Sequence, residues 1–468
     1  MTNGNQLRLE LQTIEGTPLT DELPYTGQTR EILEDADAKI GDKIRLTVKQ
    51  DGSQENVEGI LMPRFRIKDD EDYIVIKLKT GYNIGVKVNS TTKVEVTGKG
   101  TAPHFTRAEP PPRRQDLPKV CIMSTGGTIA SRIDYRTGAV EPALDAGDLY
   151  SVVPELAAIA NIDASILSSI FSENIGPQFW SKIVESVETQ IRKGADGVVI
   201  AHGTDTLGYT AAALSFALNK PPIPVVLVGS QRSSDRPSSD AATNLLASSG
   251  IAGRAPFAEV VVTMHDWISD ETIAVHRGSR VRKCHTSRRD AFRSINTPPL
   301  GYYDLTNRSL KLNTDHYERR TKQNDWATKP KFDPNVLLIK FHPGLSAGII
   351  DWATATGYKG IVLEGTGLGH VSESLFTALE RAIKNGLVVG MCSQCVWGRV
   401  HMNVYSTGRD LLRIGLIPLN DMLSETALVK MMWAFGNETD PEKVKQVMNT
   451  NLAHEFVERR IIEATPHG

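Results

Sequence analysis

The sequence has little cysteine, no excess of charge of either sign and no long apolar run, and each absence narrows the class of protein. Four cysteines in 468 residues are too few for a disulfide-stabilised secreted scaffold and fit a reducing cytoplasm. Lys and Arg number 53 against 55 Asp and Glu, so the net charge of −2 does not point to nucleic acid as the main partner. No run of about 18 apolar residues is present, and residues 1–6 lack the start of a secretory signal. We therefore expect a cytoplasmic protein without membrane contact.

Two of the cysteines, Cys392 and Cys395, form a single Cys-x-x-Cys sequence. Such a pair is half of a zinc site or a redox-active dithiol in some proteins. The other two cysteines, Cys121 and Cys284, are isolated, so no second close pair completes a metal site. We expect no metal, and we interpret the pair as two thiols at the end of a buried strand.

The first hundred residues form a module of their own. Residues 1–35 are polar and rich in turn formers, and we expect an irregular arm or short edge strands there. Apolar and polar residues then alternate, which predicts five short strands and a small β-barrel within residues 1–100. The five predicted strands are residues 43–48, 59–62, 73–78, 83–88 and 93–96.

We expect this module to bind a partner. The alternative is that it only increases the solubility of the chain. Basic residues such as Arg64, Arg66 and Lys68 suit contact with RNA, but the acidic run 69–72 dilutes them. Residues 101–117 are rich in proline, which predicts a solvated linker to the rest of the chain.

Beyond the linker, apolar strands alternate with helical patterns, which indicates an α/β fold with mostly parallel sheets covered on both faces. We expect a larger domain over residues 118–320, a smaller α/β domain over 321–440 and a helical tail over 441–468. The expected strands are residues 120–124, 166–171, 197–201, 225–228, 260–264, 336–340, 360–364 and 387–391. The expected helices are residues 145–156, 179–192, 206–217, 240–248, 374–385 and 423–433.

Two of these strands end in loops that combine glycine with threonine hydroxyls. Residues 120–123 run into Gly126 and Gly127, which Thr125 and Thr128 flank, and residues 197–201 run into His202–Thr206. In open α/β sheets ligands bind at the carboxyl ends of the strands, and glycine lets a ligand approach the backbone. A tight turn without chemistry is the plain alternative. No Gly-Lys-Ser/Thr follows, so the first loop is not a P-loop.

Residues 124–130, Ser-Thr-Gly-Gly-Thr-Ile-Ala, and residues 202–206, His-Gly-Thr-Asp-Thr, resemble the two signatures of the type I/II L-asparaginases. The resemblance covers about residues 118–440 and implies an asparaginase-like two-domain α/β fold with a threonine nucleophile. It implies that Thr128 is the nucleophile and that Tyr135, in a mobile lid, assists it. It also implies a second catalytic cluster of Thr204, Asp205 and Lys283.

The same resemblance implies a substrate-binding set around the nucleophile. Its members are Gly127, Ser172, Glu173, Gly203, Thr204 and Asp205, with Asp205 also holding the α-ammonium of the substrate. Glu173 stands where the family has glutamine, so the resemblance does not fix how the amino-acid end of the substrate is bound. The family's neighbouring subunit supplies a carboxylate, but the matching stretch here, residues 395–408, holds no acid.

Each of these residues also has an ordinary interpretation when it is taken alone. Thr204 or Thr206 can cap the following helix, and Tyr135 can be a surface aromatic. Lys283 can be a solvated charge, and Arg282 is the neighbour most easily confused with it. The agreement of all of them in order and context favours the amidohydrolase site.

The barrel, the linker and the runs 229–240 and 280–292 resemble the D subunits of archaeal glutamyl-tRNA(Gln) amidotransferases. This resemblance implies a glutaminase that takes glutamine as amide donor and passes ammonia to a separate E subunit. The E subunit then uses ATP and Mg²⁺ and contacts most of the Glu-tRNA(Gln), so this chain itself needs no cofactor. The implied assembly is a homodimer within a heterotetramer.

Two other functions stay open from the sequence. A stand-alone L-asparaginase with an accessory barrel is one of them. A non-catalytic scaffold or RNA-binding subunit is the other, and the intact set of Thr128, Thr204, Asp205 and Lys283 argues against it.

Overall fold

The computed structural model describes residues 23, 25–50, 53–62, 73–78, 83–99, 111–126, 131–133, 140–142, 146–232, 239–321 and 326–459. The chain divides into an N-terminal unit of residues 1–105 and 133–139 and a main unit of residues 106–132 and 140–468, and each is described by itself. No helix of the described residues is both long and apolar enough to cross a membrane.

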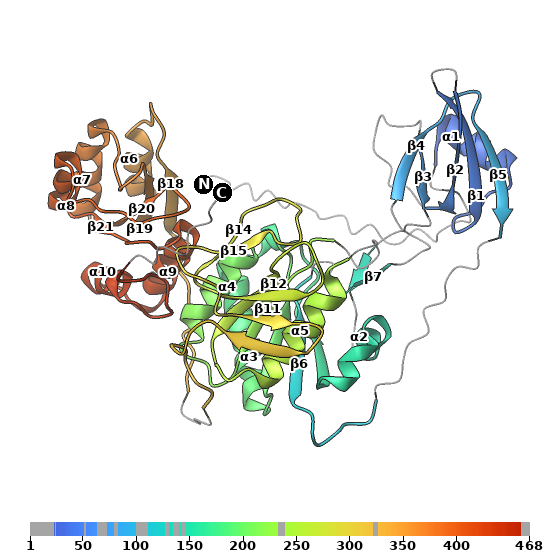
Figure 1. Ribbon diagram of the computed structural model, residues 1–468. Helices are drawn as coiled ribbons and strands as arrows, with labels where there is room; N and C mark the ends of the chain where they lie inside the picture. Colours follow the sequence, from blue (N-terminus) through green and yellow to red (C-terminus); the bar gives the residue numbers. More distant parts are fainter. Residues whose placement is uncertain are drawn as a thin grey trace, which may run out of the picture. The chain divides into compact units, whose positions relative to one another are not determined.

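The N-terminal unit is an antiparallel sheet of five strands with one helix (Figure 1). The five predicted strands are confirmed, in the order β4-β3-β2-β1-β5. Among the described residues no ladder joins β4 to β5, so closure of this sheet into a barrel is not shown. The elements are α1 (Gly27–Asp35), β1 (Lys43–Gln50), β2 (Ser53–Leu61), β3 (Tyr73–Lys77), β4 (Asn83–Lys87) and β5 (Lys93–Gly98).

Helix α1 corrects the expectation of an irregular arm or edge strands before residue 35. The helix is mostly polar and its N-cap residue makes no side-chain bond, so it has little local signal. Leu33 is fully buried against the sheet residues Ile44 and Ile74. The preceding Tyr25 donates its hydroxyl to the carbonyl of Met62 at 2.6 Å. Tertiary packing therefore stabilises this helix, and packing is not visible in the sequence.

The main unit contains a large sheet of eight strands in the order β17-β16-β13-β12-β11-β10-β6-β9. Its parallel half is β6 (Lys119–Ser124), β9 (Asn161–Ile166), β10 (Gly197–Ala201), β11 (Val225–Val228) and β12 (Val260–His265). Its antiparallel extension is β13 (Thr272–Arg277), β16 (Gly301–Asp304) and β17 (Ser309–Leu312). None of these three strands is among those predicted from the sequence.

One predicted strand of this sheet is misplaced. Residues 161–166 pair with β6, whereas the apolar run 166–171 that we predicted as a strand follows the strand end. Within that run Ile170 packs on the core from a loop, and the side chain of Phe171 is 74% exposed. Apolar composition alone therefore indicated burial near the sheet, but not which residues form the ladder.

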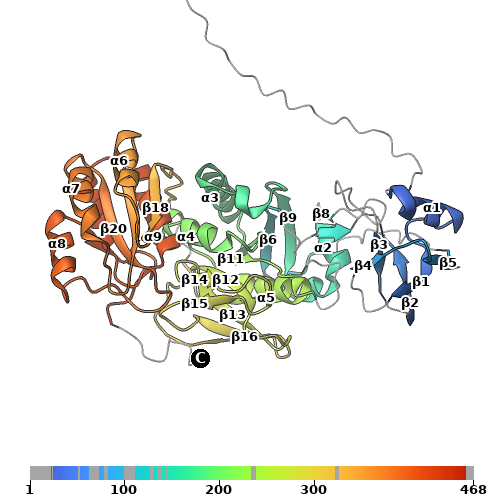
Figure 2. The same ribbon diagram turned by 90° about the horizontal axis from the view of Figure 1, so that it is seen from above.

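Helices cover both faces of the large sheet (Figure 2). One apolar core lies under α2 (Ala146–Val152), η1 (Pro154–Ala158) and α5 (Ala241–Arg254). The opposite core lies under α3 (Pro177–Arg192) and α4 (Leu207–Ala217). The helix predicted over 145–156 ends at Val152, because Pro154 disfavours helical backbone in the residue before it.

A smaller parallel sheet of four strands follows, in the order β18-β19-β20-β21. Its strands are β18 (Val336–Lys340), β19 (Gly360–Gly365), β20 (Val388–Ser393) and β21 (Ile417–Pro418). Its helices are α6 (Gly348–Ala355), η3 (Glu373–Leu375), α7 (Phe376–Lys384), α8 (Ser406–Ile414), α9 (Ser424–Asn437) and α10 (Pro441–Asn449). Cys392 is buried at the end of β20 and Cys395 is exposed, which confirms the interpretation of this pair. Helix α9 contacts both this sheet and α4 of the large domain (Figure 2).

Two short ladders and one 3-10 turn lie outside the larger sheets. The strands β7 (Ser131–Ile133) and β8 (Val140–Pro142) form one two-stranded ladder, and β14 (Val281–Lys283) and β15 (Phe292–Ser294) form another. A single 3-10 turn, η2 (Ser172–Asn174), precedes α3.

A buried arginine joins the base of the β14–β15 hairpin to the small domain. Arg280 is fully buried and donates to a carboxylate oxygen of Asp421 at 2.8 Å and to the carbonyl of Glu455 at 2.8 Å. The other carboxylate oxygen of Asp421 accepts from the backbone N–H of Val457. Asn296 adds bonds from the other end of the hairpin to the carbonyls of Gly398 and Asp421. These contacts fix the hairpin against two segments of the small domain.

Removal of the Arg280 guanidinium should destabilise the main unit strongly. Arg280→Met leaves the buried carboxylate of Asp421 without its cation, which typically costs about 3–5 kcal/mol. Urea unfolding followed by tryptophan fluorescence measures the change. Arg413→Met is the matched control, because Arg413 pairs with Asp410 on the surface and such pairs contribute about 0–1 kcal/mol. Equal losses in the two variants would contradict the account.

Candidate active site

The carboxyl ends of β6 and β10 are neighbours in the large sheet. Ser124 lies opposite Ala201 in the parallel ladder, and the carbonyl of Ala201 accepts from both the N–H and the hydroxyl of Thr125, at 3.0 and 3.1 Å. Gly126 has φ of 116°, and a Cβ there would lie 2.3 Å from the carbonyl oxygen of Ile170. The loop after β6 therefore needs glycine at this position and is bonded firmly to its neighbours.

The hydroxyl of Thr125 is engaged in this structural bond. It is fully buried, and its donor capacity is used by a backbone carbonyl. Thr125 is therefore not the free hydroxyl that an amide substrate needs. The second threonine of the same loop, Thr128, lies outside the described residues, as do Gly127 and Tyr135.

The loop that carries Ser172 is packed against the end of β10. A Cβ on Gly203 would lie 2.8 Å from Cβ of Ser172, so the absence of a side chain lets the two backbones approach. Thr206 donates its hydroxyl to the carbonyl of Ser172 at 2.5 Å. Thr206 stands at the N-cap of α4 but makes no capping bond with its side chain. Ser172 is buried and Glu173 is exposed beside it, so this loop forms one side of the site.

Lys283 brings the second cluster together. Its ammonium donates to the hydroxyl oxygen of Thr204 at 2.9 Å and to a carboxylate oxygen of Asp205 at 2.8 Å. The Lys283 side chain is 15% exposed and that of Asp205 is 71% exposed, so the carboxylate faces open space. The three residues sit on two different elements, the loop after β10 and the end of β14. The three-residue catalytic cluster that the sequence predicts is therefore assembled in the fold.

Arg282, the neighbour of Lys283, points to a different partner. Its guanidinium lies 3.1 Å from the carboxylate of Glu425 in the first turn of α9. The next residue back, Ser424, donates to the carboxylate of Glu364 at 2.5 Å. Arg282 thus belongs to the contact with the small domain, and Lys283 is the lysine that reaches Thr204.

The loop after β11 closes the third side of the cluster. A Cβ on Gly229 would lie 2.7 Å from the methyl carbon of Thr204, so only glycine fits there. The first residues of the following loop contact the buried carboxylate of Asp240. This carboxylate accepts four hydrogen bonds, from the hydroxyl of Ser230, the N–H of Gln231, the N–H of Arg232 and the side-chain amide of Asn244.

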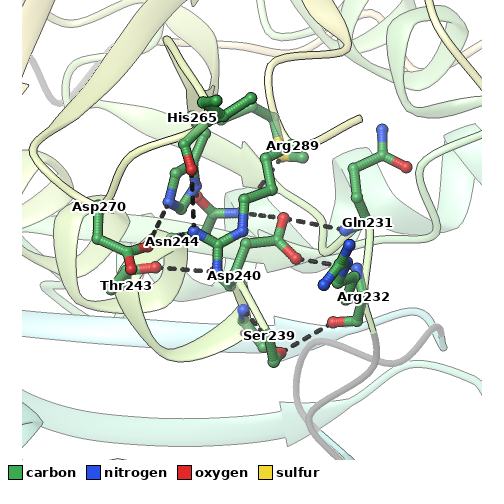
Figure 3. A network of polar contacts seen from close by, with 12 residues as sticks. Gln231, Arg232, Ser239, Asp240, Thr243, Asn244, His265, Asp270 and Arg289 are labelled. Carbon is green, nitrogen blue, oxygen red and sulfur yellow. Dashed lines mark hydrogen bonds and ion pairs between the residues drawn. The ribbon is translucent and has the colours of Figure 1, made fainter. Parts of the chain in front are cut away.

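This network continues to the loop beyond Lys283 (Figure 3). Asn244 places its oxygen 2.8 Å from Nδ1 of His265, and Nε2 of His265 lies 3.0 Å from Asp270. Asp270 in turn accepts from Arg289 at 2.7 Å. One chain of polar contacts therefore joins the loop after β11 to the segment that follows β14. Asn244 also donates to the carbonyl of Gly229, so the network holds both of the segments that contact Thr204.

Sequence reasoning did not find the residues that do this positioning. Asp240 and Arg280 lie in runs that we singled out for their resemblance to a family, but nothing in the sequence shows their partners. An isolated acid before a helical pattern is most often a helix cap, and Asp240 is the N-cap residue of α5. The position of Asp240, between a serine-rich sequence and α5, is the signal that could have distinguished it from an ordinary helix cap.

Burial keeps the imidazole of His202 neutral beside the site. Burial lowers the pKa of His202 to about 4, and the contact with the carbonyl of Gly203 at 2.7 Å opposes this shift only in part. Because Nδ1 faces a carbonyl, it carries the proton, and Nε2 accepts from the hydroxyl of Thr210. His202 is therefore a structural anchor for the loop.

No group of three or more potential metal ligands occurs among the described residues. What the arrangement offers is a threonine hydroxyl that accepts from an ammonium, next to a carboxylate. An ammonium in this place stabilises the alkoxide character of the hydroxyl and can exchange protons with it. Such a cluster suits acyl transfer or amide hydrolysis.

Three known sequence families match successive parts of the chain. "GatD N-terminal domain" matches residues 38–97, "Asparaginase, N-terminal" matches 119–317 and "Glutaminase/Asparaginase C-terminal domain" matches 335–448. Among solved structures, the thermostable L-asparaginase from Thermococcus kodakarensis is 35% identical, with a TM-score of 0.64 over 73% of this chain and 100% of that one. L-asparaginase I from Vibrio cholerae is 26% identical, with a TM-score of 0.61 over 73% and 99%. The fold and the strand-end site thus define an asparaginase-type amidohydrolase.

The relatives of the full chain are more specific. The D subunit of the glutamyl-tRNA(Gln) amidotransferase from Metallosphaera sedula is 50% identical over 443 residues, which are 94% of this chain and 98% of the relative. The D subunit from Pyrococcus furiosus is 48% identical over 92% of this chain and 97% of its own length. The chain belongs to the family of glutamyl-tRNA(Gln) amidotransferase D subunits.

Loss of the Lys283 ammonium should suppress amide hydrolysis without unfolding the protein. Lys283→Met keeps the length of the side chain but removes the donor to Thr204 and Asp205. Because positioned proton transfer contributes about 10²–10⁴-fold to such reactions, kcat should fall by that order. Ammonia release from an amino-acid amide measures it. Lys384→Met, which changes an exposed lysine at the end of α7, should keep the wild-type rate. A Lys283→Met rate within a few-fold of wild type would refute the role.

The buried His202 should make the protein sensitive to acid. Between pH 6.5 and about 4 the unfolded chain binds a proton at this residue that the folded protein does not, so stability falls as the pH falls. The pKa difference corresponds to about 3 kcal/mol over that range. Urea midpoints measured from pH 7 to pH 4 test this. His202→Gln should lose that part of the slope, whereas His342→Gln, at an exposed position, should keep it. An unchanged slope in His202→Gln would show that the imidazole titrates normally.

Proposed function

We propose that this chain is the glutaminase subunit of a tRNA-dependent amidotransferase, which releases ammonia from glutamine for the conversion of Glu-tRNA(Gln) to Gln-tRNA(Gln). The observation that carries the proposal is the ammonium of Lys283 on Thr204 and Asp205, in a chain that also has the N-terminal domain of the D subunits. Full-length similarity to D subunits supports the particular reaction.

The proposed reaction has two steps. The hydroxyl oxygen of Thr128 attacks the side-chain amide carbon of glutamine, and its proton passes to the departing nitrogen, which leaves as ammonia. A glutamyl ester on Thr128 remains. Water then attacks this ester, and glutamate leaves while the hydroxyl regains its proton. An activated hydroxyl and a positioned proton donor are what both steps require.

We assign the described residues to roles around that nucleophile. Lys283 and Thr204 act as the proton-transfer pair, in which the ammonium stabilises the negative charge that develops on the threonine oxygen as its proton is passed on. Asp205, with its exposed carboxylate beside Lys283, holds the α-ammonium of glutamine. Ser172 and the exposed Glu173 line the side where the amino-acid end of the substrate lies. Gly127 and Gly203 let the substrate approach the backbone, and Tyr135 assists Thr128.

The ammonia receiver in this proposal is a separate E subunit. That subunit uses ATP and Mg²⁺ and contacts most of the Glu-tRNA(Gln), and two copies of this chain join two copies of it. The near-balanced charge of −2 supports the assignment, because a chain that carried the tRNA alone would need a basic surface. The matched L-asparaginase is covered over its whole length by 73% of this chain, so it lacks the N-terminal domain at residues 38–97. This additional domain supports the binding of a partner subunit.

A stand-alone L-asparaginase is the second candidate. The observation that favours it is the 35% identity to an archaeal L-asparaginase over the whole length of that enzyme. The two candidates differ in their response to the partner. Ammonia release from glutamine that rises sharply with the E subunit and Glu-tRNA(Gln) supports the amidotransferase, and fast release from asparagine by the chain alone supports the asparaginase.

Thr128→Ala should abolish ammonia release and leave the fold intact. The variant removes the attacking oxygen, so glutamine hydrolysis should fall by at least about 10³-fold. Thr125→Ser is the matched control in the same loop, because a serine hydroxyl can still donate to Ala201. Retained hydrolysis in Thr128→Ala, with a normal circular dichroism spectrum, would overturn the nucleophile assignment.

A further inference from the structure

A cavity of about 390 Å³ lies away from the candidate active site. Ala158 and Ile159 come just before β9, and Ala255 and Pro256 come just before β12. Arg254, Ala255 and Pro256 lie at the C-terminal end of α5, whereas Asp240, at the start of that helix, bonds the loop beside Thr204, so the cavity and the candidate active site lie at opposite ends of α5. Its volume falls within the range of small-molecule sites, about 300–1,000 Å³.

Two arginines give this cavity a positive charge. Arg254 is the last residue of α5 and Arg308 lies in the turn between β16 and β17. No Asp or Glu is among the lining residues, and neither guanidinium has a hydrogen-bond or ion-pair partner in the described part of the chain. The turn is held by Asp304, which accepts from the N–H of Asn307 at 2.8 Å. Arg308 itself has φ of 51°, a strained value for this residue type.

A tyrosine lines the same cavity as the two arginines. Tyr303 is only 6% exposed, and a Cβ on Gly250 would lie 2.6 Å from its hydroxyl oxygen, so the hydroxyl sits at the wall of α5. Burial raises the pKa of Tyr303, the positive charges of Arg308 and Arg254 act against that shift, and the negative charge of Asp304 adds to it. Both guanidinium groups therefore act on one hydroxyl, which has no partner among the described residues.

We propose that this cavity binds the phosphate group of a nucleotide. Arg254 and Arg308 supply two positive charges, which match the charge of about −1.5 to −2 on a phosphate monoester better than that of one carboxylate. The hydroxyl of Tyr303 donates the third bond. The apolar side chains of Ile159 and Leu310 line the remaining space and contact the ribose or base. The phosphate comes from a free nucleotide or from an RNA end.

Isothermal titration of the full chain tests the proposal, and its outcome does not depend on amide hydrolysis. AMP should bind saturably with Kd below about 1 mM. Adenosine, which lacks the phosphate, should bind at least 10-fold more weakly. The double variant Arg254→Ala/Arg308→Ala should lose at least 10-fold in AMP affinity, and Tyr303→Phe should lose several-fold. Each variant should keep the wild-type rate of glutamine hydrolysis, which shows that it is folded.

The matched control is the double variant Arg381→Ala/Arg413→Ala, which removes two exposed arginines of the small domain. It should bind AMP as the wild type does. A short RNA with a 5′-phosphate distinguishes the two sources, because it binds more tightly than AMP if the RNA end is the ligand and more weakly if the free nucleotide is. Absence of saturable binding of both up to about 10 mM, equal affinity in the Arg254/Arg308 variant, or equal binding of glutamate would each overturn the proposal.

Discussion

The hydrogen bond from the ammonium of Lys283 to the hydroxyl of Thr204 is the interaction on which the account depends. It joins two segments that are 79 residues apart, the loop after β10 and the end of β14. Neither segment carries chemistry by itself, because a threonine hydroxyl needs a partner for its proton and a lysine needs a substrate to act on. The methyl group of Thr204 packs against Gly229, where a Cβ would not fit. This packing directs the hydroxyl of the threonine toward the ammonium. The remaining polar network serves to hold these two segments at this distance.

The small domain contributes to the site through the hairpin that carries Lys283. Arg280, three residues before Lys283, is fully buried and bound to Asp421 and to the carbonyl of Glu455. Loss of one partner of a buried ion pair is costly, so this contact favours one arrangement of the two domains, although Nε of Arg280 has no hydrogen-bond partner among the described residues. On the opposite side, Asp240 and His265 fix the loops that flank the cluster. Lys283 is thus placed by the contact between domains as much as by the sheet that bears Thr204.

The sequence was sufficient to predict the elements that have a strong local signal. The buried strands that end at Ser124 and Ala201 are apolar runs stopped by glycine, so both their type and their polar loops were predictable. The strand predicted at 166–171 was wrong because apolar residues such as Ile170 are buried from a loop there, and a short run does not show which residues pair. Helix α1 was missed because its stability comes from Leu33 packing on the sheet. The choice of Lys283 came from a resemblance, since no local pattern distinguishes it from Arg282 before the hairpin is folded. For the same reason the partners of Asp240 and Arg280 were not predictable.

The central claim is that the loop after β6 supplies the nucleophile while the Thr204–Lys283 cluster supplies proton transfer. A reactive diazo-ketone analogue of glutamine, which alkylates the attacking oxygen, followed by mass spectrometry of tryptic peptides, tests it most directly. Residues 120–132 and 194–232 fall in different peptides, so the two threonine loops are distinguished. The account predicts one label, on Thr128 in the first peptide, at a rate that falls sharply in Lys283→Met. A label on Thr204 in the second peptide, or labelling of Thr128 that is unchanged in Lys283→Met, would contradict it.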